Sequence, residues 1–114
     1  MKILITFLLC VTGFVSQAQT SKELIGKWKL VKETTNGVVK TPDNVYQVFM
    51  EGGKFEGING NNSRTGKWKL SEDNKKLTVR ISIVSIKFDV EYFDAKKRII
   101  SSDKIGTLEY EKVE

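Results

Sequence analysis

Apolar and polar residues alternate along most of the chain with a period of two, which is the pattern of β-strands that bury one face. The alternation is clearest at 77–83 and 86–92, where single polar residues separate the apolar ones. Glycine, asparagine and proline interrupt the pattern at short intervals, so most connections are predicted to be tight turns. About eight strands are predicted, at 26–34, 45–50, 54–59, 64–70, 77–83, 86–92, 98–101 and 107–113.

Turn signals differ in strength along the chain. Asn36-Gly37 is the strongest, because both residues tolerate positive φ. Residues 84–85 carry no strong turn signal, so a bend or bulge is expected there. Residues 20–25 begin with capping residues and predict one short helical turn. No longer stretch of helical periodicity follows this turn, and the connections are as short as those of hairpins. An all-β, small antiparallel up-and-down barrel is therefore predicted.

One pentapeptide occurs twice, as Gly26 to Leu30 and as Gly66 to Leu70, and both copies read Gly-Lys-Trp-Lys-Leu. In a strand, each copy places tryptophan and leucine on one face and lysines on the other. We expect the glycines to let the backbone pass close to a neighbouring strand and the indoles to cover one end of the barrel. The two strands are expected at comparable positions in successive halves of the meander. The predicted barrel-closing residues are Gly26, Trp28, Gly66 and Trp68.

The first residues predict an export signal. Lys2 gives a positive start, an apolar run follows, and small residues precede an expected cleavage site after Ala18. The run is shorter than the roughly 20 residues that span a bilayer, so no membrane span is expected after cleavage. Cys10 lies inside the apolar run and is expected to be removed with it. Residues 1–18 are thus predicted to be a signal peptide and 19–114 one domain, periplasmic or secreted.

Composition excludes several functions. The formal net charge is +5, but the basic residues are scattered and do not form the stripe of a nucleic-acid binder. Residues 19–114 contain no cysteine and no histidine, so neither a disulfide nor a histidine-activated nucleophile is expected. Carboxylate pairs such as Asp89 with Glu91 lie on the predicted solvated face of a strand. We therefore expect no catalytic activity, no metal site and no cofactor.

Several motifs resemble those of the small secreted lipocalin-like domains of Bacteroidetes, which are calycin-type β-barrels. Leu24 to Leu30 resembles their opening Leu-x-Gly-x-Trp-x-Leu, and Phe49 to Phe55 their central hairpin. Gly66 to Thr78 resembles a later strand and turn, and Leu108 to Lys112 the last strand. The resemblance implies a lipocalin-like barrel and says little about function. In lipocalins a basic side chain of the last strand packs on the first tryptophan; Lys112 is the nearest candidate, so this contact is expected to be weak or absent.

Ligand binding is the function that the predicted barrel favours, because eight strands leave an interior that side chains fill or that holds one small ligand. A small hydrophobic or amphipathic molecule is the expected ligand. Polar residues near one loop are candidates for the rim of the mouth: Asn59, Asn61, Asn62 and Arg64. The candidate interior residues are Phe49, Phe55, Trp68, Leu70, Ile81, Phe88 and Tyr92. The same side chains would also fill a solid barrel.

Two alternatives stay open. A solid barrel would favour a protein-interaction or protease-inhibitor-like module with a protein partner, whose contacts would come from residues 19–23 and from the loop at 60–63. An oligosaccharide-binding barrel would need exposed aromatic rings, and Phe93, opposite in parity to Tyr92, is the candidate. An open interior would favour the small-molecule hypothesis.

Overall fold

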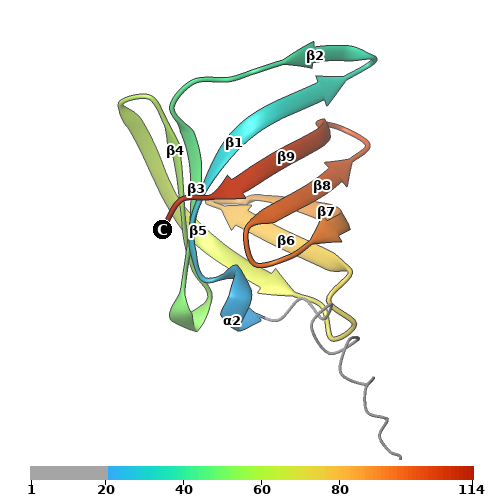
Figure 1. Cartoon of the computed structure of the whole chain (residues 1–114). Coiled ribbons are helices and arrows are strands. Elements are labelled where there is room, and N and C mark those ends of the chain that lie inside the picture. Colours follow the sequence, from blue (N-terminus) through green and yellow to red (C-terminus); the bar gives the residue numbers. More distant parts are fainter. Residues whose placement is uncertain (1–20) are drawn as a thin grey trace, which may run out of the picture.

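The computed structural model describes residues 21–114, so the predicted signal peptide lies outside the described residues. This part of the chain forms one helical turn and nine strands that curl into a closed antiparallel barrel (Figure 1). The elements are α2 (Ser21–Leu24), β1 (Gly26–Thr35), β2 (Val38–Lys40), β3 (Val45–Met50), the 3-10 turn η1 (Glu51–Gly53), β4 (Lys54–Asn59), β5 (Asn62–Leu70), β6 (Lys76–Ile81), β7 (Val84–Phe93), β8 (Lys97–Ser102) and β9 (Gly106–Lys112).

Strands that follow one another from β3 to β9 are hydrogen-bonded neighbours, and pairing of β1 with β9 closes the ring. The first half of β1 pairs with β3 and its second half with β2. β2 therefore extends one edge of β1 and is not one of the strands that form the closed ring. The ring therefore contains the eight strands β1 and β3 to β9. The predicted all-β, up-and-down barrel with a short N-terminal helical turn is confirmed. No helix within residues 21–114 is long and apolar enough to cross a membrane.

The turn at Asn36-Gly37 is confirmed. It joins β1 to β2 with Thr35 opposite Val38, and both turn residues have positive φ, 53° for Asn36 and 81° for Gly37. β2 was not among the predicted strands. Its three residues are all exposed, so they have no buried face that could give the sequence an alternating pattern.

The predicted strand at 77–83 is wrong at its end. Ile81 pairs with Val84, which makes Ser82 and Ile83 a two-residue hairpin turn. Ser82 has a φ of 60°, and the Ile83 side chain is 89% exposed. A serine at positive φ leaves no turn signal in the sequence, so the apolar Ile83 continues the alternating pattern that predicts a strand. The predicted loop at 60–63 is likewise a tight turn, because Asn59 pairs with Asn62 and β5 begins there.

A bulge in β7 overturns the predicted orientation of two aromatic residues. Val90 pairs with Ile100, but the next paired residue is Tyr92, opposite Ile99. The extra residue reverses the inward and outward faces of the strand end. Tyr92, predicted inside, is 47% exposed and donates a hydrogen bond to Asp94. Phe93, predicted outside, packs inside against Trp28, with ring centroids 5.9 Å apart.

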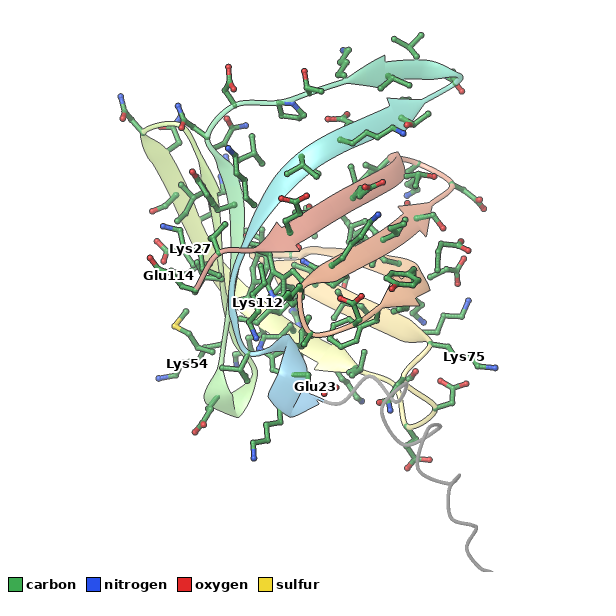
Figure 2. The ribbon with its side chains drawn as sticks, in the orientation of Figure 1. Glu23, Lys27, Lys54, Lys75, Lys112 and Glu114 are labelled. Atoms are coloured by element: carbon green, nitrogen blue, oxygen red, sulfur yellow. The ribbon has the colours of Figure 1, made fainter. Side chains whose placement is uncertain are left out.

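The end of the barrel next to α2 is closed by packed side chains, and we call it the closed end. Leu24 of α2 and Trp28 of β1 are both fully buried, and the Trp28 indole Nε1 donates to the Leu24 carbonyl oxygen at 2.9 Å. Lys112, near the end of β9, donates to the Glu23 carbonyl oxygen at 3.0 Å (Figure 2). The helical turn is therefore held from two strands and covers this end as a plug.

Both repeat tryptophans, which were predicted as barrel-closing residues, lie toward the end of the barrel that carries α2. Trp68 packs edge-on against Phe49, with centroids 5.8 Å apart, and donates to the Met50 carbonyl oxygen at 3.0 Å. Their strands, however, run in opposite directions, because three successive antiparallel pairings separate β1 from β5. The expectation of comparable positions in successive halves of the meander is therefore wrong.

The glycines of the repeat do occur where the backbone comes close to its neighbours. A Cβ at Gly66 would lie 2.1 Å from the Arg80 carbonyl oxygen on β6, and one at Gly26 would lie 2.5 Å from the Glu114 carbonyl oxygen. Gly26 also has a φ of 139°, a backbone angle that residues with a Cβ atom rarely adopt. Both positions therefore require glycine for steric reasons.

Candidate ligand cavity

The interior at the other end of the barrel is hollow and opens to solvent. This cavity has a volume of about 800 Å³ and reaches the mouth formed by the turns after β4, β6 and β8. It is lined mainly by inward-facing residues that cross-strand pairing places on one face of the sheet, such as Val79 opposite Ile86. Tyr46, Ile58 and Ser63, which pair on the opposite face, also border it. The apolar lining residues are Val45, Phe55, Ile58, Val79, Ile81, Ile86, Phe88, Ile105 and Leu108. The others are Tyr46, Gln47, Gly57, Asn59, Asn62, Ser63, Arg64 and Tyr110.

The structure divides the predicted interior residues into three groups. Phe55, Ile81 and Phe88 line the cavity. Phe49, Trp68 and Leu70 belong to the packed core and do not line the cavity. Tyr92 faces outward because of the bulge in β7, as described above.

Three of the four predicted rim residues lie at the mouth. Asn59, Asn62 and Arg64 line the cavity, brought together by the pairing of β4 with β5. Asn61 is exposed in the turn between these strands and does not line the cavity. The mouth thus combines amide groups with one cation, above walls that are mostly apolar.

Below the cavity lies a fully buried arginine that sequence reasoning missed. Arg98 of β8 is 0% exposed, and its guanidinium carbon lies 4.3 to 5.0 Å from the ring centroids of Tyr110, Phe49 and Trp28. Its Nη2 donates to Gln47 Oε1 at 2.6 Å. Within residues 21–114, its Nε and Nη1 have no hydrogen-bond partner.

Arg98 also corrects the expectation of a weak or absent cation on the first tryptophan. Trp28 has the Arg98 guanidinium 5.0 Å from its ring and the Lys112 Nζ 5.5 Å from it. The expectation was wrong because the arginine comes from β8 and not from the last strand. One signal was available in the sequence, since Arg98 shares its strand parity with the buried Ile100.

Burial shifts the pKa values of Tyr110 and Arg98 at the cavity floor. Burial is the main cause that raises the pKa of Tyr110 to about 12; the Arg98 cation opposes the shift, and the charge of Glu33 adds to it. Burial lowers the pKa of Arg98 to about 10. At neutral pH the floor therefore holds a protonated phenol beside a guanidinium cation.

Titratable groups outside the cavity are surface features. Lys76 and Asp89 form an exposed ion pair, and Lys97 Nζ lies 3.4 Å from Glu109 Oε2. The pKa of Asp94 lies below its usual range, because the Tyr92 hydroxyl and the backbone N–H groups of Lys96 and Lys97 donate to it. Across the part of the chain that the structure describes, no group of three or more acidic, cysteine or histidine residues is placed to hold a metal.

Comparisons with known proteins agree with this architecture. Residues 11–105 match the family described as the C-terminal lipocalin-like domain. A lipocalin-like protein from Bacteroides uniformis has a TM-score of 0.69 at 18% identity, over 80% of this chain and 99% of that one. An uncharacterized protein from Bacteroides eggerthii has a TM-score of 0.65, also at 18% identity, over 78% of this chain and 98% of that one. These two likenesses show a shared fold. No curated protein matches the sequence.

Proposed function

The chain belongs to the C-terminal lipocalin-like domain family, and we propose that it is an exported, non-catalytic protein that binds a small apolar or amphipathic molecule inside its barrel. One observation carries the proposal. The barrel has an open cavity of about 800 Å³ whose walls are mainly apolar. Ligand sites of proteins have volumes of about 300–1,000 Å³, mostly apolar walls and a few polar groups that fix orientation.

The mechanism follows from the position of the cavity between a closed end and an open mouth. An apolar chain that enters loses its contact with water against Phe55, Ile81 and Phe88, and such burial contributes roughly 25 cal/mol per Å² of apolar surface. The plug of α2 and Trp28 keeps water from entering at the other end. Polar groups at the mouth, such as Asn59 and Asn62, orient the exposed part of the ligand. Binding requires no covalent step, so the affinity is an equilibrium between water and the barrel.

The open interior also supports the small-molecule hypothesis over its alternatives. The protein-interaction hypothesis was tied to a solid barrel, and residues 60–61 form a tight turn with no long loop for partner contacts. The oligosaccharide hypothesis relied on an exposed Phe93, which packs against Trp28; Tyr92 is exposed in its place, and its hydroxyl donates to Asp94. Export rests on the signal peptide predicted at 1–18.

Gly57 offers a direct test, because it lines the cavity and has space for a side chain. A Cβ there would contact only the Phe55 ring within 4 Å, at 3.4 Å. We expect Gly57→Leu to fill part of the cavity and to reduce binding at least tenfold. Glu56→Leu adds the same side chain to the preceding residue of β4, which faces outward, and is the matched control.

The measurement is native mass spectrometry of each protein after incubation with a bacterial lipid extract. The wild type and Glu56→Leu should carry added mass that leaves on denaturation, and Gly57→Leu should carry little. A wild-type protein that stays free of added mass would contradict the proposal. Equal loading of Gly57→Leu would place binding outside the cavity.

A further inference from the structure

The buried guanidinium of Arg98 lacks the partner that a buried cation normally has. Its contacts are three aromatic rings and the Gln47 amide, and no carboxylate within residues 21–114 forms a salt bridge with it. Two of its nitrogens, Nε and Nη1, make no hydrogen bond to the described residues. Buried charges are normally paired and fully hydrogen-bonded. The site therefore has a positive charge without a compensating negative one.

Gln47 connects this charge to the cavity. Arginine has only donors, so the Gln47 oxygen must face Arg98 and the amide nitrogen must point elsewhere. Because Gln47 lines the cavity, its two N–H donors are available to a molecule there. The amide thus accepts from the buried cation on one side and presents donors on the other.

Tyr110 supplies a second donor at the same place. It lines the cavity, and its ring centroid is 4.3 Å from the Arg98 guanidinium carbon. Tyr110 and Arg98 are cross-strand partners on β9 and β8, so their side chains lie on the same face of the barrel wall. The cavity floor therefore presents a phenol and an amide, with a fixed positive charge directly beneath them.

We propose that the ligand carries a carboxylate head group that enters first and lies on this floor, held by Gln47 and Tyr110 as donors and by the Arg98 charge beneath. The proposal rests on the function proposed above and specifies the chemical class of the ligand. A carboxylate accepts only, and its charge-assisted hydrogen bonds are stronger than those of a neutral head group. The apolar chain of the ligand then extends along Phe88 and Ile81 toward the mouth.

Two other charged groups lie near the interior. Only the cation favours this orientation, because the Glu33 charge that acts on Tyr110 would oppose a second carboxylate there. Glu33 of β1 pairs with Leu108 and interacts with Tyr110, but it does not line the cavity. Arg64 lines the mouth, where its charge attracts an anion on its way in. The only charged residue among those that line the described cavity is therefore a cation.

A purely structural role for Arg98, as a clamp on Trp28, makes a different prediction. A clamp affects stability and leaves the choice between head groups unchanged. The test is therefore the ratio of two affinities, those of decanoate and decanol, which share an apolar chain and differ in charge. We expect the protein to bind decanoate at least tenfold more tightly by isothermal titration calorimetry, and Gln47→Leu and Arg98→Met to reduce the ratio to near one.

Arg80→Met is the matched control, because it removes an arginine whose side chain lies outside the cavity on the exposed face of β6. It should keep the wild-type ratio. Should Arg98→Met fail to fold, Gln47→Leu and Tyr110→Phe still test the floor. Equal affinities for both probes in the wild type, or an unchanged ratio in Gln47→Leu and Tyr110→Phe, would overturn the inference and leave the proposed function standing. Binding of neither probe would contradict both.

Discussion

The Trp28 indole Nε1 lies 2.9 Å from the Leu24 carbonyl oxygen, and this hydrogen bond joins the helical turn to the first strand. Both residues are fully buried, so no water replaces the contact. The ring also contacts two cations, the Arg98 guanidinium at 5.0 Å and the Lys112 ammonium at 5.5 Å from its centroid. One side chain thus connects α2, β1, β8 and β9 at the closed end.

Trp28→Phe should therefore destabilise the protein by about 1–3 kcal/mol, because it leaves a buried carbonyl oxygen unpaired and weakens both cation contacts. Urea unfolding followed by circular dichroism measures the change. Trp68→Phe is the comparison, since Trp68 makes a similar bond to Met50 but is only partly buried. An equal loss in both variants would contradict the special role of Trp28.

Gly66→Ala should cost about 2 kcal/mol or more, because its Cβ would lie 2.1 Å from the Arg80 carbonyl oxygen and would push β5 and β6 apart. Gly57→Ala is matched to it, as another strand glycine without positive φ, and its Cβ has only ordinary contact with Phe55. We expect Gly57→Ala to be neutral or stabilising by up to about 1 kcal/mol. Thermal unfolding of the two variants compares them, and equal melting temperatures would refute the steric argument.

Ionisation of Tyr110 should occur near pH 12 in the folded protein, because burial raises its pKa to about 12 from a usual value of 10.0. The folded state thus holds the phenol proton more tightly than the unfolded state does. The resulting stability is complete below pH 10 and is lost as the pH rises toward 12. The phenolate absorbance of the wild type minus that of Tyr110→Phe isolates this titration. A midpoint near 10 would mean that the phenol is solvated.

Arg98→Met should leave the unfolding free energy of the ligand-free protein unchanged or higher. Burial of a single ion costs roughly several kcal/mol of desolvation, and two guanidinium nitrogens lack partners among the described residues. Urea unfolding of the ligand-free proteins tests this. A loss above about 2 kcal/mol would show that the cation mainly supports the fold through its aromatic contacts.

Most of the fold could be predicted from local patterns. Strands such as β6 and β9 alternate buried and more exposed residues, so their positions follow largely from a period of two. Errors arose where the backbone departs from that period without a characteristic residue. The bulge before Tyr92 and the positive φ of Ser82 are both of this kind, because ordinary residues occupy these positions and tertiary pairing imposes the conformation.

The cavity was predictable only in part. The inward orientation of Phe55 and Phe88 follows from strand parity. Parity gives this orientation whether or not the interior has space for a ligand. Whether the barrel is hollow depends on the spacing of strands and the placement of the core, which no single segment encodes. The buried Arg98 was missed because a charged residue is expected to be exposed, and its burial depends on rings contributed by three other strands.

The opposite directions of β1 and β5 bear on the ancestry of the repeated pentapeptide. Rotation about the barrel axis preserves strand direction, and a twofold axis perpendicular to it exchanges the two ends. Trp28 and Trp68 lie at the same end on strands of opposite direction, so neither operation superposes one copy on the other. Five shared letters therefore do not record the duplication of half a barrel. Both copies meet one local demand, a small residue at a close backbone approach followed by a ring that covers the end of the barrel.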